Sequence, residues 1–370
     1  MDSLSRRSLF AGGAAAAAAV GVSAAADAAP AAKGKAPAAR APAGPKTGVP
    51  GLKDVWGEDF LYQWSPPEAV KRDLTPGQAT IRLSSQITPR LTSAAGQDWN
   101  ALFKAHHDAG WTAIEAGSAT WLNRKIPDSE VREIKAALKA NDVVFYNIHC
   151  AGNIIAPDPD ADRWQRHIID AIHSAEEFGL PLILTHVGSM YANRNWAHPK
   201  NWSREAWTRS VGALKRICKD TAGSKVEIAI EPVNTESINN PWAQKRLRED
   251  VGDARITSGL DITNMVFPNV AFRMSEMIDL TFDLLEDQIR YVHAKDFVWN
   301  DMLPGMNWAM NGTGNMDYEL FLARISRLKH PEVFMLVEFL NANEDYAEAQ
   351  RNIRAIAGKV GAKIHGVQGA

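Results

Sequence analysis

The stretch KVEIAIEPVN, residues 225–234, is a short run of β-branched and aliphatic residues that runs into a glutamate, Glu231. A run of this length and composition predicts a buried strand. A carboxylate at the end of a buried strand is costly unless it has a partner. The fold and the chemistry therefore depend on how often such runs recur and on which polar residues end them.

Short apolar runs alternate with amphipathic stretches of helical period from Ala79 onward. There are eight such runs, at 79–87, 111–117, 143–150, 181–188, 225–234, 256–265, 289–296 and 333–340. Strands that alternate with helices imply parallel βαβ units, and eight of them favour an α/β fold that closes into a single-domain (β/α)8 TIM barrel. An open doubly wound sheet is the alternative, but no Gly-rich phosphate-binding turn follows the first run.

The beginning of the chain predicts an export signal. Arg6 and Arg7 precede an Ala-rich apolar stretch and small residues suited to cleavage. We expect residues 1–29 to be a twin-arginine signal peptide, with an ordinary secretory signal as the alternative, and the mature protein to be periplasmic or secreted. The Ala- and Pro-rich residues 30–54 predict a disordered linker, and residues 55–370 the barrel.

The composition excludes some classes of partner. The 370 residues carry a net charge of −2, which gives no electrostatic footprint for nucleic acid. The apolar runs are too short to span a membrane. Cys150 and Cys218 predict two independent buried thiols, with one disulfide as the alternative. We expect a small-molecule partner, and the sequence leaves self-association open.

Four successive predicted strands end on side chains that bind metals. They are Glu231, Asp261, His293 and Glu338, on the fifth to eighth strands. The C-terminal ends of barrel strands meet at one mouth, so one divalent cation would satisfy all four. Three carboxylates and an imidazole suit Mn²⁺ or Mg²⁺ best, and Co²⁺ or Zn²⁺ are acceptable. Taken singly, each carboxylate could be a salt-bridged strand end and His293 a core histidine.

Three more polar residues end predicted strands and should face the same cavity: Glu115, His149 and His186. They could bind a second metal, bind substrate hydroxyls, or donate and accept protons, because histidine titrates near neutral pH. The alternative is a supporting or packing role. Histidines inside helical patterns are predicted to be surface or packing residues: His106, His107, His167 and His173.

Tryptophans in the predicted loops suit sugar faces, because their rings are flat and amphipathic. The alternative is that they pack lids over the barrel. The loop tryptophans are Trp121, Trp196, Trp202, Trp242, Trp299 and Trp308. Of these we predict Trp121 and Trp299 to bind substrate, together with Glu115, Asn264 and Lys295.

With these residues in this order, residues 80–365 resemble the xylose-isomerase-like TIM barrels. These form the sugar phosphate isomerase/epimerase superfamily, which includes the ketose 3-epimerases. The resemblance is carried by the motifs IAIEPVN, LDITN, VHAKD and VEF and by the Gly-x-Gly segment NGTGNMDYELFLARI. It implies that Glu231, Asp261, His293 and Glu338 bind one divalent metal, and that Glu231 and Glu338 also transfer protons.

The chain departs from the relatives at two places. Asn264 stands where the ketose epimerases usually carry a histidine, and FVWND (297–301) stands where they carry an arginine. Endonuclease IV, on the same barrel, binds three metals with histidines that resemble His149 and His186. It also needs a histidine at the Asn264 position and an Asp-x-His pair that is absent here, which argues against a DNA-repair site.

The sequence favours a metal-dependent enzyme that abstracts a proton next to a sugar carbonyl through a metal-stabilised enediolate. Isomerisation or epimerisation is the expected outcome. One alternative is a lyase, in which His149 or His186 starts β-elimination of a 3-keto-glycoside. The other is a periplasmic sugar-binding protein without chemistry, although retention of all four metal ligands argues against it. An exported protein should meet a free or glycosidic sugar rather than a sugar phosphate.

Overall fold

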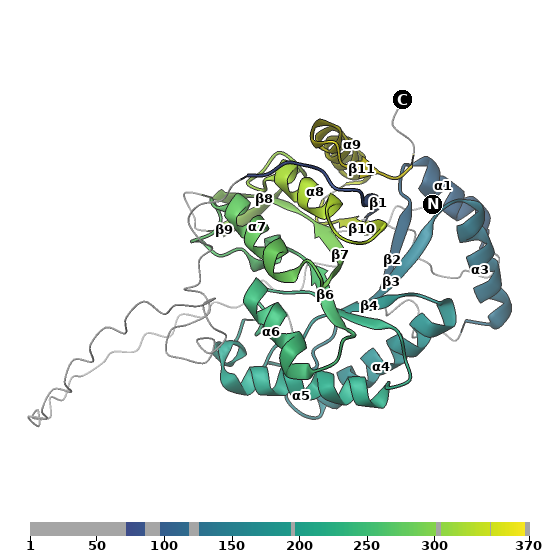
Figure 1. Cartoon of the computed structure of the whole chain (residues 1–370). Helices are drawn as coiled ribbons and strands as arrows, with labels where there is room; N and C mark the ends of the chain where they lie inside the picture. Colours follow the sequence, from purple (N-terminus) through teal and green to yellow (C-terminus); the bar gives the residue numbers. More distant parts are fainter. Residues whose placement is uncertain are drawn as a thin grey trace, which may run out of the picture. The chain divides into compact units, whose positions relative to one another are not determined.

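The computed structural model describes residues 72–85, 97–117, 126–193, 197–300, 305–340 and 342–366. In these residues parallel strands form a curled sheet that helices surround, as Figure 1 shows. The barrel strands are β1 (Thr80–Ser85), β2 (Ala113–Gly117), β3 (Val144–Cys150), β4 (Leu182–Thr185), β5 (Glu227–Ile230), β6 (Ile256–Leu260), β7 (Ile289–Ala294) and β10 (Glu332–Val337). The additional strands are β8 (Asp296–Asn300), β9 (Gly305–Ala309) and β11 (Lys363–Ile364).

The helices alternate with these strands along the chain. They are α1 (Trp99–Asp108), α3 (Asp128–Ala140), α4 (Asp160–Phe178), α5 (Arg204–Asp220), α6 (Pro241–Val251), α7 (Met274–Leu285), α8 (Tyr318–Ser326) and α9 (Asn343–Val360), with the 3-10 turns η4 (Pro199–Trp202) and η5 (Thr263–Met265). Each of the eight predicted apolar runs coincides with one barrel strand, although β10 begins one residue before its run, at Glu332, so the predicted alternation is confirmed. The predicted signal (1–29), the predicted linker (30–54), the first residues of the predicted barrel and Trp121 lie outside the described residues.

The sheet closes into a barrel. Its strand order is β11-β1-β10-β7-β6-β5-β4-β3-β2, and all of its pairs are parallel. Between β1 and β2, the Thr112 N–H donates to the Leu83 carbonyl at 2.9 Å. β11 pairs with the first residues of the same edge of β1. The predicted (β/α)8 barrel is therefore confirmed, and the open doubly wound sheet is excluded.

Side chains from the strands fill the barrel and form a core cluster of their own. Its buried members are Ala113, Leu182, Leu184, Ala229, Tyr291, Phe334 and Leu336. Residues two apart on a strand point to the same side. The candidate site residues stand two positions further along, as Glu231 does beyond Ala229 and His293 beyond Tyr291. At Gly259 of β6 a Cβ would collide with Leu184, so the interior has no room for a side chain there.

Strand β3 departs from this period of two because it contains a β-bulge. Its register with β2 pairs Ile114 with Phe145 and then Glu115 with Asn147, so one extra residue is inserted in β3. Bulges of this kind redirect the side chains that follow them. Here the bulge places His149 beside Glu115, with His149 Nδ1 3.1 Å from Glu115 Oε1.

The helices begin and end at the residue types that capping requires. Asp98 accepts a hydrogen bond from the Ala101 N–H at the start of α1, and Ser203 accepts one from the Ala206 N–H at the start of α5. Gly179 ends α4 in the left-handed conformation, with φ of 70°. These caps fix where each helix stops and thus how each βα unit returns to the barrel.

A two-stranded hairpin, β8–β9, lies between β7 and α8, and the pattern of eight apolar runs did not predict it. The sequence signal for the hairpin is the aromatic and β-branched content of FVWN (297–300) and the tryptophan of MNWA (306–309), with the Pro-Gly dipeptide 304–305 between the two segments. Beyond the hairpin, the Asp296 carboxylate accepts hydrogen bonds from the N–H groups of Gly312, Gly314 and Met316. The Gly-x-Gly segment is therefore folded around one buried carboxylate.

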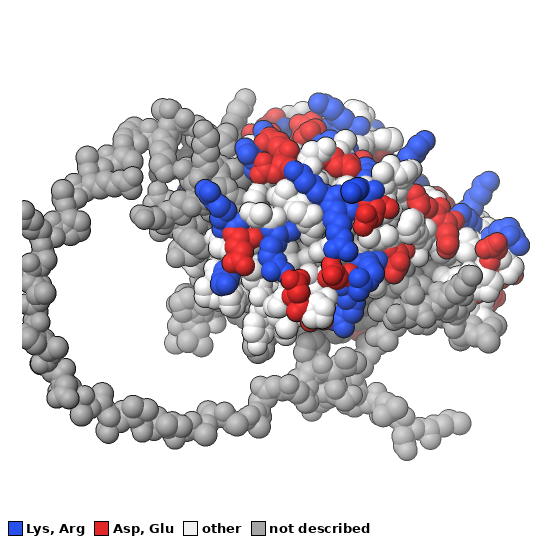
Figure 2. All heavy atoms as spheres, turned by 90° about the horizontal axis from the view of Figure 1, so that it is seen from below, with Lys and Arg blue, Asp and Glu red and all other residues white. Residues whose placement is uncertain are grey.

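Basic and acidic side chains are intermingled on the face that Figure 2 shows. Ion pairs also join neighbouring helices, as between Arg216 of α5 and Asp162 of α4 at 2.6 Å. Cys150 and Cys218 are both buried and form no disulfide, which confirms the prediction of two independent thiols. Among the described residues, no helix combines the length and the apolar character that a membrane span requires.

Candidate active site

The four predicted metal ligands converge at the mouth of the barrel. Glu231, Asp261, His293 and Glu338 are 3, 0, 3 and 5% exposed. His293 Nδ1 lies 3.2 Å from Glu231 Oε1, 3.7 Å from Asp261 Oδ2 and 3.4 Å from Glu338 Oε2. One ligand atom from each of the four lies within 4.8 Å of the others. We call this group the carboxylate cluster.

The side chain of Lys295 enters the same cluster. His293 and Lys295 are two residues apart on the chain, and both point to the centre. The Lys295 Nζ contacts Asp261 Oδ2 closely, lies 2.9 Å from Glu338 Oε2 and lies 3.7 Å from Glu231 Oε1. A divalent cation bound by these oxygens would compete with the ammonium for them.

The charges of the cluster stabilise one another. Burial alone would lower the pKa of His293, but the Glu338 and Glu231 carboxylates raise it well above its ordinary value. Burial alone would raise the pKa of Glu338, but His293 and Lys295 lower it. Each of these pKa shifts favours the charged form of the group, so the positive and negative groups of the cluster stabilise one another.

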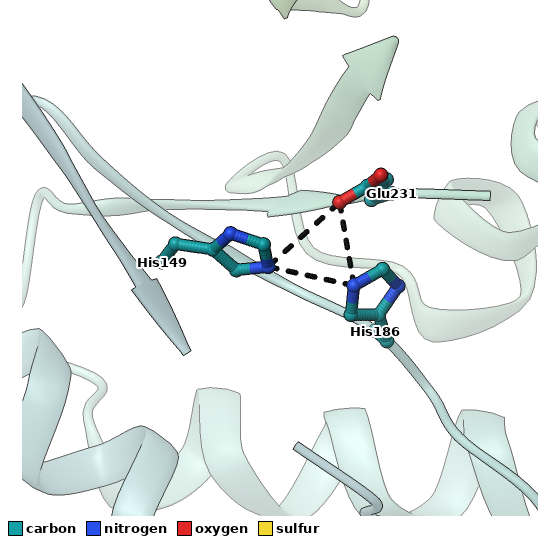
Figure 3. Close-up of side chains that lie close together, drawn as sticks. All are labelled: His149, His186 and Glu231. Atoms are coloured by element: carbon teal, nitrogen blue, oxygen red, sulfur yellow. Dashed lines mark hydrogen bonds and ion pairs between the residues drawn. The ribbon is translucent and has the colours of Figure 1, made fainter. Parts of the chain in front are cut away.

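Glu231 links the carboxylate cluster to a pair of histidines. Its Oε1 faces His293, whereas its Oε2 lies 3.3 Å from His186 Nε2 and 3.8 Å from His149 Nε2. The two Nε2 atoms are 3.4 Å apart. Figure 3 shows the two imidazoles, from β3 and the end of β4, pointing toward this one carboxylate. The structure thus brings together all seven residues predicted to end strands.

Glu115 holds two of these histidines in place. Its Oε1 lies 3.1 Å from His149 Nδ1, and its Oε2 lies 3.6 Å from His293 Nε2. A carboxylate can only accept, so the Nδ1 of His149 donates to Glu115, and in the neutral imidazole the lone pair is on Nε2, which lies 3.4 Å from His186 Nε2. Burial alone would lower the pKa of His149, but Glu115 raises it. Asn147 donates to Glu115 Oε2 at 2.7 Å and fixes the carboxylate in turn.

Comparison with protein families identifies the fold family. Residues 103–356, more than half of the chain, match the family model described as "Xylose isomerase-like TIM barrel". The chain belongs to this family. The resemblance noted in the sequence is thereby confirmed. A search of functionally curated proteins finds no significant match.

Solved structures of xylose isomerase-like and related proteins share the fold at low sequence identity. The probable 3-DHS dehydratase from Bacillus anthracis is 14% identical, with 75% of this chain and 99% of that chain covered and a TM-score of 0.57. The D-psicose 3-epimerase from Clostridium cellulolyticum H10 is 12% identical, with 75% and 98% covered and a TM-score of 0.56. A Xylose isomerase-like TIM barrel protein from Mycobacterium smegmatis, in complex with magnesium, is 12% identical, with 76% and 96% covered and a TM-score of 0.53.

The residues of this xylose isomerase-like barrel fit a divalent cation. The carboxylate cluster offers three carboxylates and one imidazole, which is an oxygen-rich donor set. Cis ligands of an octahedral ion at about 2.1 Å lie roughly 3 Å apart, close to the spacings around His293 Nδ1. His149, His186 and Glu231 form a second group of nitrogen and oxygen donors that could hold a cation, and it shares Glu231 with the first.

The remaining predicted site residues that the structure describes contact the carboxylate cluster or the core around it. Asn264 donates to Glu231 Oε1 at 2.7 Å, and its backbone N–H donates to Asp261 Oδ1 at 3.0 Å. Thr263, which was not among the predicted site residues, donates to the same Asp261 oxygen at 2.6 Å. Trp299 is half-buried and packs against the largest core cluster. Substrate binding by Asn264, Lys295 and Trp299 remains a prediction.

Proposed function

We propose that this chain is a metal-dependent enzyme that removes a proton from the carbon next to a sugar carbonyl and returns it, and thus an isomerase or epimerase. One observation carries the proposal: the two oxygens of Glu231 face different groups, one the carboxylate cluster and the other the His149–His186 pair. A carbon held at this junction would have a cation site on one side and proton carriers on the other.

Glu231, Asp261, His293 and Glu338 would hold the cation, with Mn²⁺ or Mg²⁺ as the first choice and Co²⁺ or Zn²⁺ acceptable. When bound, such an ion polarises a carbonyl oxygen and offsets the negative charge that develops as a neighbouring C–H proton leaves. The magnesium complex of the Mycobacterium smegmatis protein supports this choice.

The positions of the side chains around the site identify the groups that would carry the proton. Glu231 and Glu338 are buried carboxylates from the ends of two different strands, and both lie within 3.4 Å of His293 Nδ1. We propose that one removes the proton and the other returns it. His149 and His186 are the second pair of carriers, because Glu115 orients the Nε2 lone pair of His149 toward the site. Each would transfer the proton to or from the sugar carbon or its neighbouring hydroxyl.

The orientation of His149 also favours a second candidate, β-elimination. In a 3-keto-glycoside, a histidine base removes the proton at C2, and the C1–O bond to the aglycone breaks. The neighbour described as a probable dehydratase supports this alternative, because dehydration is an elimination. A sugar-binding protein without chemistry is the third candidate, and it requires neither an oriented base nor a cation.

Three measurements separate these functions. We expect the purified full-length chain to bind about one equivalent of Mn²⁺ or Mg²⁺ in calorimetry. We expect it to exchange deuterium from D₂O into at least one of D-fructose, D-psicose and D-tagatose. Glu231→Gln and Glu338→Gln should each lower this exchange by at least about 100-fold, since positioned acid–base groups contribute that much or more. Asp250→Asn on α6, a carboxylate paired with Arg246, is the matched control and should not change it.

Other outcomes assign the alternatives. Release of p-nitrophenol from a p-nitrophenyl 3-keto-glucoside, lost in His149→Asn and without exchange into free ketoses, would assign elimination. Two equivalents of metal, reduced to one in His186→Asn, would assign the histidine pair to a second cation. No metal binding and no exchange in wild type would contradict both enzyme proposals.

We further propose that the chain is exported through its twin-arginine sequence to the periplasm or beyond. In a Gram-negative host, the full chain should accumulate in the periplasmic fraction. The double variant Arg6→Lys, Arg7→Lys should remain in the cytoplasm, because paired arginines are the feature that the export route reads. Equal periplasmic levels of the two proteins would contradict this assignment.

A further inference from the structure

An exposed pair of aromatic rings lies next to the carboxylate cluster. Trp308 of β9 stacks on Phe339 with ring centroids 4.7 Å apart and an interplanar angle of 29°. The two residues are 42% and 43% exposed. Lys295 Nζ lies 4.6 Å from the Phe339 centroid and 5.9 Å from the Trp308 centroid. The aromatic pair and the cluster therefore share Lys295 as a neighbour.

Phe339 adopts an unfavourable backbone conformation. It directly follows Glu338, and its φ of +61° lies in the left-handed region that bulky L-residues avoid. Burial of the ring would be the ordinary compensation, but the residue remains 43% exposed. Strain of this kind gathers at ligand-binding sites, where the surrounding structure maintains it.

Trp308 is exposed although it stands on the side of the hairpin that packs against the protein. It is paired in register with Phe297, and Trp299 is paired with Met306 on the same face. Phe297 is fully buried, and Trp299 and Met306 pack against the core. Trp308 continues this inner face toward the cluster, yet its ring is accessible to a ligand.

We propose that Trp308 and Phe339 form a stacking subsite for a closed sugar ring, so that the substrate binds as a pyranose or pyranoside ring rather than as an open chain. This inference rests on the proposed function and narrows its substrate class. A pyranose ring has a flat C–H face that matches an aromatic surface, and polar edges that match the buried carboxylates beside it. An open-chain ketose has no such face. A purely apolar ligand would leave the charges of the cluster unsatisfied.

A closed ring also has a consequence for the reaction. Isomerases and epimerases act on the open-chain carbonyl form, whereas a 3-keto-pyranoside has its carbonyl inside the ring and its aglycone still attached. A ring bound at this subsite can therefore undergo elimination directly, whereas isomerisation or epimerisation requires that the ring open first. In the elimination the C2–H bond breaks, its electron pair forms the C1=C2 bond, and the aglycone leaves with the C1–O pair and a proton.

The test compares methyl pyranosides with their matched alditols. Methyl β-D-glucopyranoside, methyl α-D-mannopyranoside and methyl β-D-galactopyranoside are titrated by ligand-observed NMR against the full-length chain with Mg²⁺, beside D-glucitol, D-mannitol and galactitol. We expect at least one pyranoside to bind at least tenfold more tightly than its alditol. Trp308→Ala and Phe339→Ala should each weaken that binding at least tenfold.

Two controls keep folding effects apart from recognition. Trp308→Phe retains an aromatic face and should keep most of the affinity. Phe272→Ala removes a phenylalanine that is 71% exposed and should leave the affinity unchanged. Alditols that bind as tightly as pyranosides, or alanine variants within twofold of wild type, overturn the proposal, as does a failure of all three pyranosides to bind.

The same samples separate this inference from the proposed function. If Mg²⁺ binds and is lost in Glu338→Gln, while pyranosides and alditols bind alike, the closed-ring subsite fails and the metal-dependent enzyme stands. If pyranosides bind through Trp308 and Phe339 in protein that binds no metal, the subsite stands and the proposed function fails.

Discussion

At the scale of single residues, the site depends on carboxylates whose two oxygens face different partners. Glu231 contacts His293 with one oxygen and His186 with the other, and Glu115 does the same for His149 and His293. Carboxylates shared in this way hold the imidazoles in one orientation. The Lys295 ammonium lies among them and partly neutralises their charge.

Replacement of Lys295 tests its competition with the cation. In Lys295→Met the carboxylates of Asp261 and Glu338 lose their ammonium partner, so we expect Mn²⁺ to bind at least tenfold more tightly, which corresponds to about 1.4 kcal/mol. The metal-free variant should melt at a lower temperature, because a carboxylate pair is left without its counter-charge. Calorimetry measures the affinity, and Lys359→Met on the exposed side of α9 is the control. Weaker Mn²⁺ binding would instead show that Lys295 positions the carboxylates for the ion.

The strain at Phe339 gives a second prediction at this scale. Alanine and glycine both remove the stacked ring, but only glycine adopts a φ of +61° without steric cost. Phe339→Gly should therefore be more stable than Phe339→Ala by about 1 kcal/mol. Urea unfolding of the two variants measures the difference. Equal stability would mean that the backbone relaxes once the ring is removed, so that the ring itself imposes the conformation.

At the scale of elements, the segment after β7 supports the mouth of the barrel. The chain leaves β7 through Lys295, forms the β8–β9 hairpin, and returns through the Gly-x-Gly turn into α8. Asp296 accepts four backbone hydrogen bonds, from Phe297, Gly312, Gly314 and Met316. A Cβ at Gly314 would collide with Asp296 and Phe297, so the turn closes around the carboxylate with no space left. The hairpin that carries Trp308 is thereby fixed next to the carboxylate cluster.

Substitution of Asp296 tests this support. In Asp296→Asn one carboxylate oxygen becomes an amide that donates, so the N–H groups it served lose their acceptor. We expect a loss of about 2–3 kcal/mol of stability, with faster hydrogen exchange at residues 311–316. Metal affinity should change little, since Asp296 does not touch the proposed ligands. Asp279→Asn, which alters an ion pair with Arg324 between α7 and α8, is the control that should leave exchange at 311–316 unchanged.

At the scale of the whole molecule, the barrel brings distant parts of the chain into one buried cluster of charges. Residues from β2 to β10 contribute to it, and the strands beneath it form an apolar core. The ionic residues are stable there only because each has a partner of opposite charge or a hydrogen-bond donor. Elsewhere, buried titratable groups make the stability of the fold depend on pH.

His106 of α1 gives a prediction for acid stability. Its side chain is buried on the inner side of α1, where its Nε2 lies 2.9 Å from the Ala113 carbonyl. Burial lowers the pKa of this imidazole to about 4. In the unfolded chain the imidazole takes up its proton near pH 6.5, so folding stability falls as the pH drops from about 6.5 to 4. The loss from this group is on the order of 3 kcal/mol.

Thermal melting of His106→Gln measures this effect, because glutamine can donate to the Ala113 carbonyl but does not titrate. The difference in melting temperature between wild type and variant should be constant above pH 7 and should shift in favour of the variant toward pH 4. If the melting temperatures of the two proteins differ by the same amount at every pH, then groups other than His106 govern the acid stability.

The sequence by itself determined the repeat of eight strands, because the length and apolar character of each run follow from local burial. It also determined the seven strand-end residues, because side chains two apart on a strand share a face and the polar one stands just past the apolar core. Only the tertiary structure decided that Glu231 faces two groups, that a bulge in β3 turns His149 toward Glu115, and that the Lys295 ammonium lies among the proposed ligands. It alone placed Trp308 beside Phe339, which are 31 residues apart in the sequence. Contacts of this kind depend on register, on a hairpin and on one left-handed residue, and each of these is set by packing across the barrel rather than by the neighbours along the chain.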